Sequence, residues 1–388
     1  MRAALVLTGA LVLLPPVPAF AQSVQVSGMV SLLGSGRLGT ESEPSLGARV
    51  IPEVKLAIAS GRGVTVDAEV SANAFGTVSL PSDHSTQTTG DVKPYRAWLR
   101  FSTSRFEARA GLQKVSFGSA TIFRPMMWFD SLDPRDPLQL TDGVYALLLR
   151  YFTASNASAS AWTMYGNDSR RGWDLAPPDR KTPEFGGRVQ IPLFRGEVAA
   201  TYHRRKAAIG DVVRSMDPPA AAPPGPVAVS PVAEERFGLD GKWDLGVGFW
   251  LEGALVHQKT PLISRPYQLA LNAGLDYTFG VGNGLTAVAE HFRLESSGRA
   301  LSRGDSRSFS ALLLRYPLGL LDELSGIFYL DWKTRNVYRF VTWRRTYDAL
   351  SLNTSLFWNP DVVLVFAGQP GSSSFAGTGL QLLLSYHF

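Results

Sequence analysis

The feature that most constrains the fold of this chain is a two-residue alternation of apolar and polar side chains, repeated in many segments. In residues 64–74 every second residue is Val or Ala, and the residues between them are Thr, Asp, Glu, Ser and Asn. Side chains of a β-strand point alternately to its two faces, so such a segment has one apolar and one polar face. A strand that crosses a bilayer has this pattern, because one face meets lipid and the other meets a lumen.

The same alternation recurs along most of the chain. Further segments that show it cleanly are 49–58, 95–101, 106–114, 184–191, 267–279 and 350–358. Segments 284–294, 309–316 and 335–345 can be phased either way, so we assign no lumen face to them. Dividing the chain by about 20–22 residues per strand and its share of turns predicts about 16–18 strands. We therefore expect an all-β fold, a transmembrane antiparallel β-barrel.

A soluble β-sandwich also alternates and is the main alternative fold. The predicted strands, however, reach about ten residues, whereas about five or six is usual in globular proteins. Charged side chains lie in the middle of strands, at Asp67, Glu69, Arg100 and Arg109. Apolar faces also occur on more strands than one sandwich core could bury. These three observations favour the barrel.

The first 21 residues have the pattern of a secretory signal peptide. A positive start precedes an uncharged apolar stretch from Ala3 to Leu14, and Ala19-Phe20-Ala21 fits a cleavage site. The apolar stretch is too short for a spanning helix and is followed by prolines. We predict cleavage after Ala21, which leaves residues 22–388 as one exported barrel domain. Together with the alternation, export indicates the bacterial outer membrane.

The C-terminal segment carries a family resemblance. Its apolar face consists of Leu380, Leu382, Leu384, Tyr386 and Phe388. With aromatic residues at the terminal and third-last positions, it resembles the last strand of bacterial outer-membrane β-barrel proteins. The resemblance implies that the barrel-assembly machinery reads Phe388 as its signal.

A second, narrower resemblance covers residues 111–151. This block runs from Gly111-Leu112-Gln113-Lys114 through Trp128-Phe129-Asp130 to Asp133-Pro134-Arg135-Asp136-Pro137. It is similar to a block in uncharacterised porin-like outer-membrane proteins and to a region of alginate-export-type barrels. The similarity implies a porin-like barrel and indicates no substrate.

Two long loops differ in character. Residues 206–234 are rich in Pro and Ala and are expected to form an extended external loop. Residues 115–143 carry apolar side chains, including Ile122-Phe123 and Met126-Met127-Trp128-Phe129, that a solvated loop would not need. We predict that this segment folds into the barrel and packs against the wall as a constriction. The alternative is an external loop that covers its own small core.

Charged residues near the predicted constriction are the candidate pore-lining site. The wall set is Arg96, Arg100, Arg109, Lys114, Arg150 and Arg188, and the loop set is Arg124, Asp130, Asp133, Arg135 and Asp136. A basic wall opposite an acidic loop would create a transverse field that orients polar or charged solutes. In the alternative interpretation these charges neutralise one another and hold the loop in place.

The sequence favours passive transport over chemistry. It lacks the motifs of zinc proteases, nucleophile-elbow hydrolases, phosphate-binding loops and calcium loops, and its 5 histidines are scattered. It contains no cysteine, and we expect no cofactor and no metal. The net charge of +5 is too small for a dedicated nucleic-acid binder.

We therefore expect a porin-like channel for small polar or charged solutes, surrounded by outer-membrane lipid and able to form a homotrimer. Two alternatives stay open. One is a barrel enzyme acting on lipids or peptides, for which His203 with a Ser or Asp partner is the candidate. The other is a plugged barrel with a structural or secretion-associated role.

Overall fold

The computed structural model describes residues 23–38, 44–61, 63–80, 85–210, 230–360 and 375–388. The predicted signal peptide lies outside these residues, and so does most of the predicted external loop 206–234. No helix in this part of the chain is long and apolar enough to cross a membrane.

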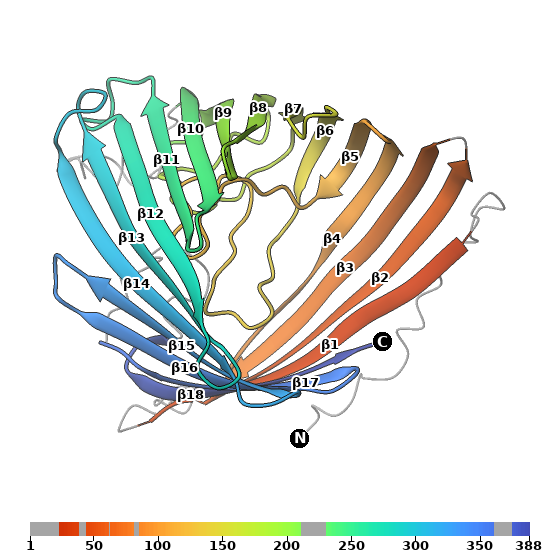
Figure 1. Cartoon of the computed structure of the whole chain (residues 1–388), viewed down its shortest axis with the longest axis vertical. Coiled ribbons are helices and arrows are strands. Elements are labelled where there is room, and N and C mark those ends of the chain that lie inside the picture. The colour runs from red at the N-terminus through yellow and green to blue at the C-terminus, as the bar shows by residue number, and fades with distance from the viewer. Residues whose placement is uncertain (1–22, 39–43, 62, 81–84, 211–229, 361–374) are drawn as a thin grey trace.

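The described residues form eighteen β-strands that surround a central space in chain order (Figure 1). Their bounds are β1 Ser23–Arg37, β2 Ser45–Gly61, β3 Val64–Ser79, β4 Gln87–Thr103, β5 Phe106–Gln113, β6 Val144–Phe152, β7 Ser158–Met164, β8 Glu184–Leu193, β9 Gly196–Ala207, β10 Val232–Asp244, β11 Gly248–Gln258, β12 Tyr267–Phe279, β13 Leu285–Ser297, β14 Asp305–Pro317, β15 Asp322–Asp331, β16 Val337–Thr346, β17 Leu350–Trp358 and β18 Thr378–His387.

The barrel closes where the first strand meets the last. Each strand pairs antiparallel with its neighbours in sequence, and β1 also pairs with β18, from Met29 opposite His387 to Arg37 opposite Gly379. The backbone of Phe388 continues this pairing through two hydrogen bonds with Gly28. A Cβ on Gly28 would lie 2.6 Å from the Phe388 ring, so a glycine is needed here. The expected all-β barrel is confirmed, with a strand number at the top of the predicted range.

On many strands the outer face is apolar and exposed and the inner face is polar and buried. On β10 the apolar Leu239 is 68% exposed on the outer face, whereas Glu234 on the inner face is 1% exposed. On β12 Leu275 is 47% exposed and Asn272 is 3% exposed. The strand faces assigned from the alternation are therefore correct, and the outer surface has the apolar character that lipid requires.

The two ends of the barrel differ. At one end, here called the turn end, short connections join the strands, such as residues 104–105 and 194–195. The opposite loop end has longer connections, including residues 114–143 and 165–183. The chain enters and leaves the described barrel at the turn end, because β1 begins there and β18 finishes there.

Candidate functional site

The predicted segment 115–143, which lies in the connection between β5 and β6, folds into the barrel as predicted and is called the inward loop below. Figure 1 shows it as a yellow trace in the middle of the strands. Its apolar side chains are sequestered: Ile122, Phe123, Met126 and Met127 are each at most 2% exposed. This segment is therefore not an external loop that covers only its own core.

The apolar residues of the inward loop pack on one side of the barrel wall. The ring of Phe123 stacks on Phe292 at 5.4 Å and on Phe309 at 6.0 Å, and meets Tyr329 edge-on at 5.7 Å. The wall residues of this buried cluster belong to β6, β7 and β11–β17. The three segments that could be phased either way in the sequence correspond to β13, β14 and β16. Their inward faces are apolar because they pack on this cluster.

Two carboxylates of the same part of the wall bind the backbone of the inward loop. Glu290 on β13 accepts hydrogen bonds from the amides of Thr121, Ile122 and Phe123 at 2.6–3.0 Å. Glu252 on β11 accepts bonds from the amides of Ala120 and Met126, both at 2.8 Å. Charge-assisted bonds to buried amides are stronger than neutral ones, so the two glutamates fasten the loop at five points.

Glycines make room for these contacts. Gly118 has a φ of +101°, and a Cβ there would lie 2.4 Å from the carboxylate of Glu252. On β10, a Cβ on Gly238 would lie 2.1 Å from the sulfur of Met126. At both places the close approach of loop and wall requires a residue without a side chain.

The charged residues predicted in the inward loop are paired within it. Arg124 forms an ion pair with Asp130 at 2.6 Å, and Arg135 forms one with Asp133 at 2.6 Å. Both carboxylate oxygens of Asp136 accept backbone amides of the same loop. In the two ion pairs the charges neutralise one another and hold the loop, and Asp136 holds it through backbone amides.

Burial raises the pKa of the Asp136 carboxyl above its ordinary value, although the amides of Leu138 and Leu140 act in the opposite direction. The docked loop therefore favours the protonated carboxyl more than free solution does.

Three of the predicted wall arginines form one cluster on adjacent strands. Arg100 binds Asp67 through two hydrogen bonds, at 2.8 and 2.9 Å. Glu107 lies 3.2 Å from Arg109 and 3.7 Å from both Arg100 and Arg150. With three cations and two carboxylates, the cluster has a surplus of one positive charge. The ring of Trp98 lies beside it, 4.9 Å from the Arg109 guanidinium.

The other predicted wall residues have different surroundings. Arg96 donates to the backbone oxygen of Thr141 and so ties the end of the inward loop to β4. Arg188 is buried in an ion pair with Asp240 at 2.6 Å. Lys114 is exposed directly after β5. The structure thus brings Arg100, Arg109 and Arg150 together and places the remaining three apart from them.

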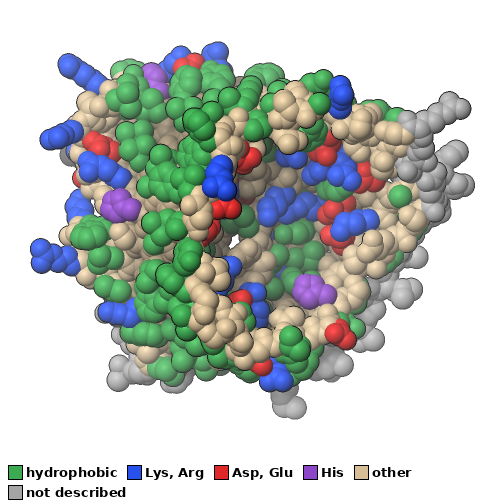
Figure 2. Space-filling model, in the orientation of Figure 1, with side chains coloured by type: hydrophobic (Ala, Val, Ile, Leu, Met, Phe, Trp, Pro, Cys, Tyr) green, Lys and Arg blue, Asp and Glu red, His purple; other side chains and the backbone are tan. Residues whose placement is uncertain are grey.

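The side of the lumen next to β1–β5 differs from the side under the loop. Among the described residues, these strands contribute nothing to the apolar cluster that holds the inward loop. Their inward positions, with those of β6, carry Glu53, Lys55, Asp67, Glu69, Arg100, Glu107, Arg109 and Arg150. Figure 2 shows a hollow next to these strands, on the right of the view, with Lys, Arg, Asp and Glu side chains at its wall.

A second loop, residues 165–183 between β7 and β8, also reaches inward, which the sequence analysis did not predict. Its Trp173 stacks on Phe292 at 4.5 Å and donates to the backbone oxygen of Arg124. Its Asp174 pairs with Arg205 at 3.0 Å and with Arg236 at 2.7 Å. This second loop therefore supports the inward loop from the loop end.

His203, the candidate residue for catalysis, is 1% exposed. Its Nδ1 accepts a hydrogen bond from the indole of Trp162, so its Nε2 carries the proton and donates to Glu184 at 3.0 Å. Phe129 of the inward loop packs edge-on against the ring, with centroids 4.9 Å apart. The histidine is thus a packed part of the wall. Within the described ranges, no group of three or more His, Asp or Glu residues could hold a metal ion.

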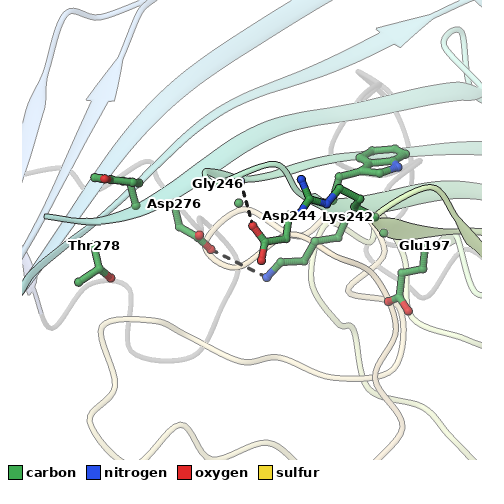
Figure 3. A pocket seen from close by; sticks show the side chains of 11 residues that line it. Glu197, Lys242, Asp244, Gly246, Asp276 and Thr278 are labelled. Atoms are coloured by element: carbon green, nitrogen blue, oxygen red, sulfur yellow. Dashed lines mark hydrogen bonds and ion pairs between the residues drawn. The ribbon is translucent and has the colours of Figure 1, made fainter.

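A cavity of about 640 Å³ lies at the turn end, among β9–β12 (Figure 3). Its charged lining includes Glu197, Lys242, Asp244 and Asp276, and the ammonium of Lys242 lies 3.9 Å from Asp276. The lining is mixed in sign and open, as expected for the mouth of a lumen.

Glu252 and Glu290 were not among the residues predicted from the sequence. Glu252 is the single acid of the otherwise apolar stretch Gly248–Val256, whereas Glu290 lies between Ala289 and His291. For Glu252 the available signal was a lone acid flanked by apolar residues, because such a group must bind donors once it is buried.

No model of a protein family matches this sequence, and no curated protein matches it. Solved structures do match. OccK7 (OpdD) of Pseudomonas aeruginosa aligns with a TM-score of 0.57 at 10% identity, over 95% of this chain and 99% of that chain. OccK5 (OpdH) of the same organism aligns with a TM-score of 0.56 at 12% identity, over 95% and 99%. OccK8 (OprE), also from P. aeruginosa, aligns with a TM-score of 0.55 at 8% identity, over 95% and 99%. This likeness concerns the fold, a closed antiparallel β-barrel.

Proposed function

We propose that this porin-like barrel is a bacterial outer-membrane channel through which small polar or charged solutes diffuse passively. The observation that carries the proposal is the division of the lumen. An apolar loop covers one side of it, and the inward positions of the other side, on β2–β6, carry charged residues. Solutes would pass between the inward loop and this charged wall, where size and charge select them.

The proposed orientation follows from the two ends. Long loops of such barrels face the outside and short turns face the periplasm. On this orientation Phe388 lies at the periplasmic end, where the barrel-assembly machinery would read it, after a signal peptide has directed export. Assembly of three barrels into a homotrimer belongs to the same proposal. No catalytic step is part of it.

Conductance across a planar lipid bilayer tests the channel. The purified protein is expected to produce discrete current steps, and insertion without current would favour the plugged barrel. In the variant Arg100→Glu with Arg109→Glu, the cluster changes from a surplus of one positive charge to a surplus of three negative charges.

We expect this variant to shift the cation-to-anion permeability ratio toward cations by about threefold or more. A threefold shift corresponds to less than about 1 kcal/mol in the electrostatic free energy of an ion at this wall. The charge-conserving pair Arg100→Lys with Arg109→Lys serves as the control and is expected to keep the wild-type ratio. An unchanged ratio in the glutamate variant would show that ions do not pass along this wall.

A further inference from the structure

The outer face of β9–β11 carries cations close to the loop end. Arg204 on β9 lies opposite Glu235 on β10, which in turn lies opposite His257 on β11. Arg204 is exposed, and its inner neighbours Thr201, His203 and Arg205 are buried, so Arg204 points away from the lumen.

Two lysines extend this group by one step toward the loop end. Lys206 lies opposite Ala233, whose backbone oxygen accepts the amide of Lys259. The ammonium of Lys259 pairs with Glu235 at 2.8 Å. Among the described residues, the side chains of Arg204 and Lys206 have no ion pair. Arg204, Lys206 and Lys259, here called the outer cationic surface, therefore carry three positive charges against one carboxylate.

The outer cationic surface borders an apolar surface. Toward the middle of the barrel the next outward residues are Tyr202 and Phe237, whose rings lie 5.1 Å apart. Beyond them Leu239 is 68% exposed. On the other flank, His257 and Tyr267 stack with ring centroids 4.1 Å apart. Aromatic side chains mark the level where hydrocarbon ends and head groups begin, so the cations lie at head-group level.

We propose that the outer cationic surface binds the phosphate groups of a phosphorylated glycolipid in the leaflet on the loop side. This inference rests on the membrane location in the proposed function. Cations at this depth attract anionic head groups, and phosphate matches both the guanidinium of Arg204 and the two ammonium groups. The acyl chains of the same lipid would lie along Tyr202, Phe237 and Leu239.

The test uses the detergent-solubilised barrel and two probes, bis-phosphorylated lipid A and the same lipid without its phosphates. Bound lipid is measured by native mass spectrometry across a titration. In the variant R204Q/K206Q/K259Q we expect about 100-fold weaker binding of the phosphorylated lipid, which corresponds to about 1 kcal/mol for each cation removed. The variant K55Q/R195Q/K242Q is the matched control, because it loses the same charge from lumen and cavity positions.

Binding of phosphorylated lipid A that the control variant retains and the triple variant loses would support the inference. Equal binding by the triple variant, equal binding of the dephosphorylated lipid, or displacement by free inorganic phosphate would each overturn it. Conductance of the same preparations separates the two proposals. A conducting barrel without lipid binding refutes the lipid site alone, and lipid binding without conductance refutes the channel alone.

Discussion

Replacement of Glu290 by glutamine is expected to loosen the inward loop where the wall holds its backbone. In the wild type one carboxylate oxygen accepts the amides of Thr121 and Ile122 and the indole of Trp250. The other accepts the amide of Phe123 at 2.6 Å and the side-chain amide of Asn272 at 2.9 Å. A glutamine can keep a carbonyl oxygen at only one of these two positions.

The magnitude follows from the donors that lose an acceptor. With the carbonyl at the position that serves three donors, the new NH₂ group faces Phe123 and Asn272. Asn272 can turn its amide, because its Oδ1 has no partner among the described residues and can then accept. The amide of Phe123 has no such option. A buried unsatisfied donor costs about 1–3 kcal/mol, and the remaining bonds lose their charge assistance. We expect about 3 kcal/mol in total, or about a hundredfold in the opening equilibrium.

Hydrogen exchange of peptides covering residues 119–127 measures this opening, with mass spectrometry of the barrel in detergent. The expected result for E290Q is exchange about a hundredfold faster in this segment, with the strand amides of β13 still protected. Glu295→Gln is the matched control, because Glu295 lies on the same strand and binds Arg293 and the amide of Gly304 instead of the loop. Exchange within about twofold of wild type in E290Q, or equal acceleration in both variants, would refute the anchoring role of Glu290.

Two further predictions concern the same loop. Gly118→Ala is expected to destabilise loop docking by about 2–4 kcal/mol, because the added Cβ meets the Glu252 carboxylate at 2.4 Å and φ is +101°. Hydrogen exchange of the amides of Ala120 and Met126 measures this loss. The control is Gly63→Ala, which lies in open space at φ +78° and is expected to leave the loop unchanged. Burial raises the pKa of Asp136, so its contribution to docking is fully present below about pH 4 and is lost as the pH rises through the raised value. Protection of residues 136–140 from hydrogen exchange should fall over that pH range in the wild type and less so in Asp136→Asn. Parallel pH profiles of protection in the two proteins would contradict this assignment.

The fold was predictable because a barrel wall imposes a strict period of two wherever its inner face meets water. For strands whose inner face contacts protein, the sequence did not show which face points into the lumen. Phe292, Phe309 and Phe340 point inward like Asn272 and Glu107, but they contact the inward loop or its surroundings. Period alone carries no information about which side of an apolar strand faces the lumen.

The candidate site was predictable in part. The apolar run Ile122–Phe129 indicated that its loop packs inside, and the structure confirms this placement. Which donors Glu252 and Glu290 bind was not predictable from the sequence, because it depends on which strands lie against the loop in the closed barrel, more than 120 residues away in sequence. The second loop, with Trp173 and Asp174, was missed for the same reason.

The pairing of β1 with β18 has a consequence for how the molecule is made. β18 follows the other seventeen described strands in sequence, so a ribosome completes it only after all of them. Until then the sheet has two open edges that invite aggregation, and the contact joining them closes a loop that contains all the other described strands. The closed ring therefore forms only once β18 has been made and has paired with β1.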